Sequence, residues 1–218
     1  MKSFAVIGCG RFGSSLARTL FSLGNEVMAI DISEEAIHEI SNSVTHAVVA
    51  DVMDETVLKE LGLRNFDVVI VSIGSDLQAS IMATLVAKEI GVKRVLAKAQ
   101  SELHGKVLQK IGADKVVYPE RDMGYRVAHN LTSESILDYI ELSPDYSILE
   151  IVAIEGWYEK SLSELRLRNK FGVNVIAVKR GNDVNLSPSG DDVIYEGDIL
   201  VVIGSCNGIK KLEHKAGE

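Results

Sequence analysis

Six short apolar runs divide the first 120 residues of this 218-residue chain, and segments with the spacing of amphipathic helices lie between them. Most of these runs contain Val, Ile and Ala with little alternation between apolar and polar residues. Such runs are typical of parallel strands that helices cover on both faces. We therefore predict a complete Rossmann-type α/β domain, a doubly wound parallel sheet, over residues 1–120. The expected strands are residues 4–7, 27–31, 47–51, 68–72, 94–98 and 115–118.

The pattern changes after Pro119. Apolar residues recur at helical spacing over 122–138, so we expect one helix that crosses between two lobes inside a segment at 121–143. Its apolar stripe suits either a dimer interface or packing on its own sheet.

Turn-forming residues at 142–145 interrupt the chain. A small α+β C-terminal domain is expected beyond this break, over residues 144–218. Its helices are predicted at 161–170 and 207–213, and its strands at 147–155, 173–179 and 199–203.

The composition narrows the functions open to such a chain. Its net charge of −8 argues against general binding to nucleic acid, which normally requires a basic surface. The two cysteines, Cys9 and Cys206, are too far apart in sequence to indicate a disulfide framework or a zinc site. No apolar run reaches the roughly 18 residues that a membrane span needs, and no signal peptide precedes the first strand. We therefore expect a cytoplasmic protein, and hydropathy leaves open whether it attaches to a membrane protein through a partner surface.

A glycine turn follows the first apolar run and opens the first helix. In the pattern Gly8-x-Gly10-x-x-Gly13, the first glycine permits a tight turn, the second admits a phosphate close to the backbone, and the third lets the helix pack on the strand. Backbone N–H groups and the helix dipole then hold phosphates. Asp31 ends the second strand, where its carboxylate can accept hydrogen bonds from ribose hydroxyls and disfavours the 2′-phosphate of NADP.

Further candidate residues stand in this turn or at the carboxyl ends of strands, where ligands bind in such sheets. Many strand-end polar residues are simply solvated, but together these positions would surround one crevice. The set comprises Phe12, Ile32, Asp51, Val52, Ser72, Ile73, Gly74, Lys98 and Glu120.

Arg11 is unusual because a plain dinucleotide site needs no cation inside the glycine turn. Its guanidinium can pair with a terminal phosphate. Glu120 would face the same region, and a carboxylate beside phosphates needs a cation between them, so Glu120 is a candidate ligand for Mg²⁺ or Ca²⁺.

The sequence offers little for catalysis. None of the six tyrosines has a lysine four residues on, as a short-chain oxidoreductase requires, and the C-terminal lobe has only His214, near the chain end. A nucleotide sensor is therefore favoured over an NAD-dependent oxidoreductase or epimerase. A third hypothesis is a constitutive structural subunit, in which the nucleotide serves only as a cofactor for folding.

Several segments carry a family resemblance, among them FAVIGCGRFGSSLA, THAVVAD, KIGADKVVYPERDMG and EGDILVVIG. They resemble the KTN/RCK regulatory proteins of potassium transport, which join a TrkA-N lobe to a TrkA-C lobe, and most closely the Ktr-type members. The similarity covers nearly the whole chain.

The resemblance implies an assembly and ligands. Such proteins form homodimers that assemble into octameric rings beneath a membrane potassium channel subunit of the KtrB, KtrD or TrkH type. ATP and ADP bind the first lobe and ATP promotes the active ring, although Trk-type relatives prefer NAD(H). By position, Gly8, Gly10, Arg11 and Gly13 hold phosphates, and Glu120 lies near the nucleotide and a divalent cation.

The resemblance also implies a second ligand. In Ktr-type relatives the dimer of C-terminal lobes binds cyclic di-AMP, which inactivates transport. The matching residues here are Arg168 for phosphate and an apolar set for adenine, although the same stretch could be a simple dimer surface. The full set comprises Arg168, Phe171, Asn174, Val175, Ile176 and Pro188.

Overall fold

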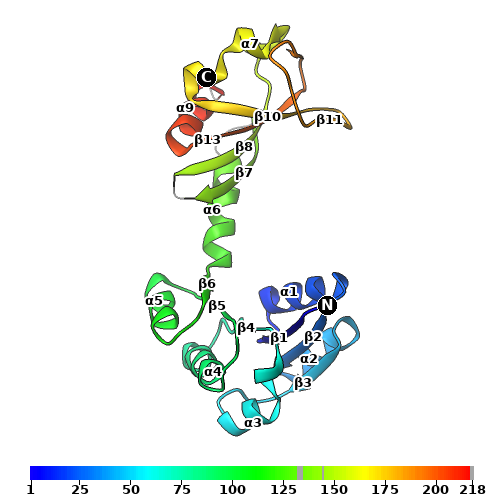
Figure 1. The fold of residues 1–218 in the computed structure, drawn as a ribbon, viewed down its shortest axis with the longest axis vertical. Helices are drawn as coiled ribbons and strands as arrows, with labels where there is room; N and C mark the ends of the chain where they lie inside the picture. The colour runs from blue at the N-terminus through cyan, green and yellow to red at the C-terminus, as the bar shows by residue number, and fades with distance from the viewer. Residues whose placement is uncertain (132–134, 144, 217–218) are drawn as a thin grey trace. The chain divides into compact units, whose positions relative to one another are not determined.

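A computed structural model describes residues 1–131, 135–143 and 145–216 of the chain. The chain divides into two compact units, Met1–Glu120 and Arg121–Glu218, whose elements are labelled in Figure 1. Among the described residues, no helix combines the length and the apolar character needed to cross a membrane.

The N-terminal unit is built on a six-stranded parallel sheet with the order β3-β2-β1-β4-β5-β6. All six predicted strands form, and the predicted Rossmann-type fold is confirmed. The strand order reverses between β1 and β4, so the carboxyl ends of these two strands flank a crevice. The strands are β1 (Ser3–Ile7), β2 (Glu26–Asp31), β3 (His46–Val49), β4 (Val68–Val71), β5 (Val95–Lys98) and β6 (Lys115–Val117).

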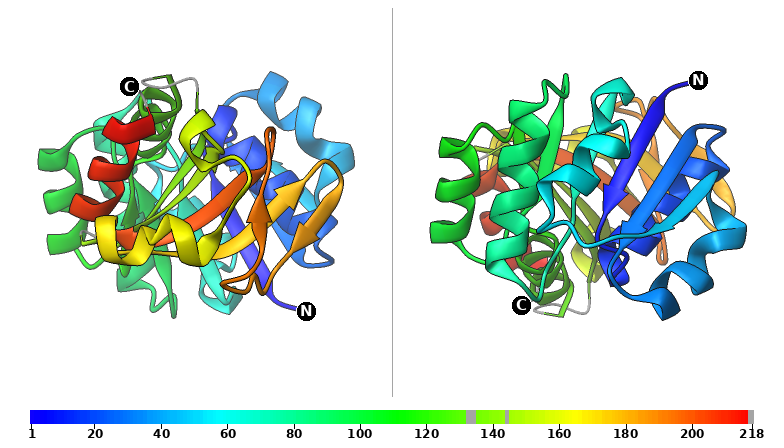
Figure 2. Two further views of the ribbon diagram at one scale, coloured as in Figure 1. Left: turned by 90° about the horizontal axis from the view of Figure 1, so that it is seen from above. Right: turned by 90° about the horizontal axis from the view of Figure 1, so that it is seen from below.

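Helices cover both faces of this sheet (Figures 1 and 2). Residues at alternate strand positions bury on opposite faces, so Val6 and Ile70 pack under α1 and α2, whereas Ile7 and Val71 pack under α3, α4 and α5. The helices are α1 (Arg11–Ser22), α2 (Glu34–Ile40), α3 (Glu55–Glu60), α4 (Leu77–Glu89) and α5 (Glu102–Lys110), with 3₁₀ turns at Ser41–Ser43 and Leu63–Asn65.

The first helix begins differently from the other four. The side chains of Ser33, Asp54, Asp76 and Ser101 each accept a hydrogen bond from a backbone N–H group in the first turn of α2, α3, α4 and α5. The N-cap of α1 is Gly10, which has no side chain to accept one. Because the first N–H groups of a helix have no partner within it, those of α1 are left available beside the carboxyl end of β1.

The C-terminal unit holds a five-stranded antiparallel sheet with the order β11-β10-β13-β8-β7 and a small sheet of β9 and β12. One face of the larger sheet packs against α8 and α9. The strands are β7 (Ile136–Ser143), β8 (Tyr146–Val152), β9 (Lys160–Ser161), β10 (Val173–Arg180), β11 (Asp183–Asn185), β12 (Val193–Ile194) and β13 (Ile199–Ser205). The helices are α6 (Pro119–Leu131), which begins two residues before the unit, α7 (Leu162–Leu165), α8 (Leu167–Phe171) and α9 (Cys206–Ala216), with a 3₁₀ turn at Glu155–Trp157.

Two predicted helices differ from the structure. The helix expected over 122–138 ends at Leu131, and Ile136–Ser143 instead forms β7, because this segment pairs with β8 across a hairpin. Residues 132–134 of the expected helix, and residues 144 and 217–218 of the expected C-terminal domain, lie outside the described residues. The helix expected over 161–170 divides into α7 and α8 at Arg166, whose φ of 51° is left-handed and cannot continue a helix.

An ion pair between a buried carboxylate and an exposed guanidinium fixes the end of β10 in the C-terminal unit. Asp198 is fully buried and accepts hydrogen bonds from Nε and Nη2 of Arg180, each 2.7 Å long, and from the Tyr195 N–H group at 2.8 Å. Burial alone would raise the pKa of the Asp198 carboxyl, but these hydrogen bonds and the Arg180 charge outweigh it and lower the pKa. The folded state therefore holds Asp198 as a carboxylate.

We predict that Arg180→Ala destabilises the protein by about 2–3 kcal/mol at neutral pH, because it leaves a buried carboxylate without its cation. In the variant, burial then dominates and raises the pKa of Asp198. As the pH falls, Asp198 becomes protonated, and the free-energy cost of the buried, unpaired charge disappears. The stability difference from wild type, measured by urea unfolding, should therefore shrink between pH 7 and pH 4. Lys211→Ala, at an exposed position on α9, is the control. A difference that stays constant with pH would contradict this account.

Candidate functional site

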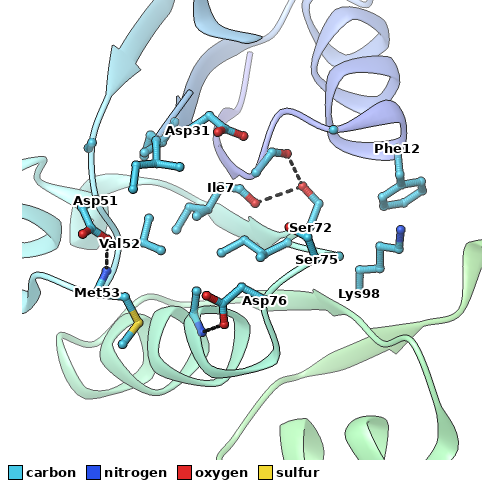
Figure 3. Close-up of a pocket in the computed structure, with 18 of the residues that line it drawn as sticks. Ile7, Phe12, Asp31, Asp51, Val52, Met53, Ser72, Ser75, Asp76 and Lys98 are labelled. Atoms are coloured by element: carbon cyan, nitrogen blue, oxygen red, sulfur yellow. Dashed lines mark hydrogen bonds between the residues drawn. The ribbon is translucent and has the colours of Figure 1, made fainter. Parts of the chain in front are cut away.

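A cavity of about 800 Å³ opens at the carboxyl ends of β1, β2, β4 and β5 (Figure 3). It lies at the crevice that the reversal of strand order creates. The predicted N-terminal residues that line it are Gly8, Gly10, Arg11, Phe12, Asp31, Ile32, Asp51, Val52, Ser72, Ile73, Gly74, Lys98 and Glu120.

Gly13 is the predicted residue that does not line the cavity, because it is buried where α1 meets the sheet. A Cβ atom at this position would lie 1.9 Å from the Gly8 carbonyl oxygen and 2.4 Å from Ser72 Oγ. Ser72 Oγ itself donates a hydrogen bond to the Gly8 carbonyl oxygen at 2.6 Å, so the residue that follows β4 holds the glycine turn in place. Gly13 therefore shapes the turn by allowing the helix to approach it.

Gly8 and Gly10 have separate roles in the turn. Gly8 has a left-handed φ of 96°, and a Cβ there would lie 2.9 Å from the Ile73 nitrogen. Gly10 has an ordinary φ of −68°, and nothing lies within 4 Å of a Cβ at this position. Gly8 is thus required by the backbone, whereas Gly10 keeps the space above the start of α1 clear.

Asp31 is held in a fixed orientation at the end of β2. Its Oδ2 accepts the Cys9 N–H at 2.6 Å, and its Oδ1 accepts the Ser33 N–H at 2.9 Å. Burial, reinforced by the Asp31 charge, raises the pKa of the Cys9 thiol to about 12. Cys9 is therefore a neutral thiol and not a nucleophile.

Lys98 and Glu120 form an ion pair at one end of the cavity. Lys98 Nζ lies 2.5 Å from Glu120 Oε1 and 5.9 Å from the centre of the Phe12 ring, toward which it points in Figure 3. The hydrogen bond from Lys98 lowers the pKa of Glu120, and the charges of Lys98 and Arg11 act in the same direction. Glu120 is therefore ionised.

Glu120, the predicted ligand for Mg²⁺ or Ca²⁺, has Lys98 as its partner in this structure. No cluster of three His, Cys, Asp or Glu side chains that could hold a metal occurs in the described part of the chain. Protein side chains alone therefore do not form a cation site there, and a cation would need phosphate oxygens as further ligands.

Sequence reasoning missed several lining residues. Asp76 is the most informative, because its Oδ1 caps α4 by accepting the Ala79 N–H at 2.9 Å. Its position just after a strand and just before a helix was a signal that could have found it. Asp51 is oriented similarly, since its Oδ1 accepts the Met53 N–H at 2.9 Å. The missed residues are Ile7, Ile30, Ala50, Met53, Ser75, Asp76 and Ala79.

In a single copy, the predicted C-terminal set divides between surface and core. Arg168 on α8 and Asn174 and Ile176 on β10 are exposed, whereas Val175 between them packs against the core. The pairing of β10 with β13 is irregular between Val175 and Ala177, so the regular alternation of strand residues between faces is interrupted at Ile176. Phe171 and Pro188 are half-buried.

Two family models match this chain: the TrkA-N domain over residues 4–119 and the TrkA-C domain over residues 149–217. The chain belongs to the TrkA-N/TrkA-C family. It is 51% identical to Ktr system potassium uptake protein C of Bacillus subtilis (strain 168), over 98% of this chain and 97% of that protein. Protein A of the same system and organism is 45% identical, over 98% and 96%. The predicted family resemblance is confirmed.

The fold of this TrkA-N/TrkA-C chain also occurs in a solved channel structure. The GsuK channel bound to NAD superposes with a TM-score of 0.69 at 18% identity, covering all of this chain and 40% of the channel chain. At this identity the likeness concerns the fold. The choice of ligand must therefore come from the side chains of the TrkA-N cavity.

The glycine geometry of the TrkA-N unit predicts opposite outcomes for two alanine substitutions. Gly13→Ala should lower stability by about 3 kcal/mol, because the added methyl group meets backbone and Ser72. Gly10→Ala should change stability by less than about 0.5 kcal/mol while reducing the stabilisation that a bound nucleotide provides. Thermal unfolding with and without ATP measures both effects. Equal melting temperatures for the two variants without ligand would contradict the assignment.

Proposed function

We propose that this chain is a nucleotide-sensing regulatory subunit of a Ktr-type potassium uptake system. ATP and ADP compete for the cavity of the N-terminal unit, and ATP favours the active assembly. The 51% identity to a Ktr system potassium uptake protein over almost the whole length of both chains supports the transport system. The cavity supports nucleotide binding.

The position of Arg11 is the observation that carries this proposal. Arg11 is exposed at the first residue of α1, directly after the uncapped Gly10. The free N–H groups and the helix dipole suit phosphates, and the guanidinium adds a cation that can reach an oxygen further along the phosphate chain. Asp31 is fixed at the end of β2, in position to accept hydrogen bonds from ribose hydroxyls.

NAD(H) is the alternative ligand, because the GsuK channel holds NAD with the same fold. The cationic side chains of Arg11 and Lys98 favour an anionic phosphate over a nicotinamide ring, which is neutral in NADH and positively charged in NAD⁺. The described residues that line the cavity include no His, Tyr or Cys to act as an acid or base, which supports a binding protein over an NAD-dependent oxidoreductase.

The proposal extends to the assembly. The chain forms dimers within an octameric ring, and the ring docks at the inner face of the membrane on a channel subunit of the KtrB, KtrD or TrkH type. Glu120 joins phosphate oxygens in holding Mg²⁺ or Ca²⁺ once ATP is bound. A ligand shifts such a ring only by binding one of its states more tightly, so discrimination between ATP and ADP at each cavity is the quantity to measure.

Calorimetry with ATP, ADP and NADH tests the proposal. Arg11→Ala should weaken ATP binding about 10- to 30-fold, because it removes a charge-assisted hydrogen bond, and should weaken ADP binding less than about threefold. Arg18→Ala, on the same helix with its guanidinium on the Glu39 carbonyl oxygen, is the matched control. Equal wild-type affinity for ATP and ADP would refute the proposal, and tight NADH binding alone would establish the alternative.

Cyclic di-AMP is proposed as an inhibitor that binds the dimer of C-terminal units. The exposed Arg168, Asn174 and Ile176 support such a surface. Arg168→Ala should weaken binding of cyclic di-AMP about tenfold and leave ATP affinity unchanged. Lys170→Ala, an exposed cation two residues away on α8, is the control. If Arg168→Ala binds cyclic di-AMP as wild type does, the contact set is wrong.

A further inference from the structure

The two partners of the Lys98–Glu120 pair lie in different environments. Lys98 is 9% exposed, whereas the Glu120 side chain is 70% exposed. A buried ammonium without a counter-charge is costly, so Lys98 always requires an anion beside it. An exposed carboxylate is solvated by water and loses little when its partner leaves. Glu120 can therefore lose its partner without a replacement, whereas Lys98 can leave Glu120 only if another anion takes its place.

A nucleotide in the cavity would bring a second anion to Lys98. The ammonium lies next to Gly74, where a Cβ would be 3.4 Å from Nζ, and near Phe12, the residue after Arg11. The phosphate end of the proposed nucleotide lies on the same side of the cavity, at the start of α1. A lysine has a flexible stem with rotatable donors, so Nζ can turn from a carboxylate to a phosphate without movement of β5.

Resting on the proposed function, we propose that Lys98 exchanges partners: it pairs with Glu120 when the cavity is empty and with the terminal phosphate when ATP is bound. Lys98 is thus a second specificity residue for ATP, on β5, whereas Arg11 lies on α1. The exchange also frees the Glu120 carboxylate, which is then available to a divalent cation that the phosphates share.

The exchange would act at the junction of the two units. Glu120 is the last residue of the N-terminal unit and the second residue of α6, which continues into the C-terminal unit. Glu120 lies in the first turn of α6, where the helix dipole stabilises a carboxylate. ATP binding in the cavity would in this way change the ionic partner of Glu120, the last residue before the C-terminal unit.

A double-mutant cycle, with ATP affinity measured by calorimetry in EDTA, tests the exchange. Glu120→Gln should tighten ATP binding about tenfold in the wild-type background, because Lys98 no longer has to leave a carboxylate. In the Lys98→Met background the same change should have an effect of at most about threefold, since only repulsion between Glu120 and phosphate is removed. If Glu120→Gln increases ATP affinity by an equal or larger factor in the Lys98→Met background, Lys98 does not change partners when ATP binds. That result would overturn the exchange.

Two controls separate this inference from its foundation. Lys88→Met removes another lysine of the same unit, paired with Asp114 at 3.0 Å outside the cavity, and should leave ATP affinity unchanged. Lys98→Gln replaces Lys98→Met if thermal unfolding shows that the methionine variant does not fold. If wild-type protein binds ATP and ADP equally well, the proposed function is refuted. If it prefers ATP but Glu120→Gln does not increase ATP affinity more when Lys98 is present, only the exchange is refuted.

Discussion

The close approach of α1 to the sheet is the contact on which the cavity of the N-terminal unit depends. With only a hydrogen atom as its side chain, Gly13 lets the first turn of α1 rest on the Gly8 carbonyl oxygen, and Ser72 ties that oxygen to β4. This contact places the N-terminus of α1, which has no side-chain cap, at the carboxyl ends of the strands. Several other parts of the cavity are placed by strands whose ends meet that edge, among them Asp31 at the end of β2 and Lys98 at the end of β5.

The N-terminal unit was largely predictable because its signals are local. A strand buried on both faces needs an unbroken apolar run, and a phosphate turn needs glycines at fixed spacing, so both are visible in the order of residues. The cavity lining followed from one rule, that ligands meet the carboxyl ends of strands. The pairing of Lys98 with Glu120 was not predictable, because it depends on how β5 and β6 stand beside each other and on which lysine rotamer the neighbouring residues allow.

The C-terminal unit was less predictable because its structure rests on non-local pairing. Residues 136–138 continue the helical spacing of the preceding segment, yet they join β7 because β8 offers backbone partners to Ile136 and Asp138. The division of the 161–170 helix depends on a single left-handed residue, Arg166, whose type gives no warning of that conformation. The second-ligand set could be proposed only from family resemblance, which places that site between two copies of the chain.

The protonation state of Cys9 has a practical consequence for experiments on this protein. Thiol-reactive dyes and mild oxidants attack the thiolate, and burial beside Asp31 keeps Cys9 protonated at any pH at which the protein would be handled. Cys206, the other cysteine of the sequence, is half-buried at the start of α9 in the C-terminal unit. Thiol-directed labelling should therefore spare Cys9 and leave the glycine turn of the cavity intact.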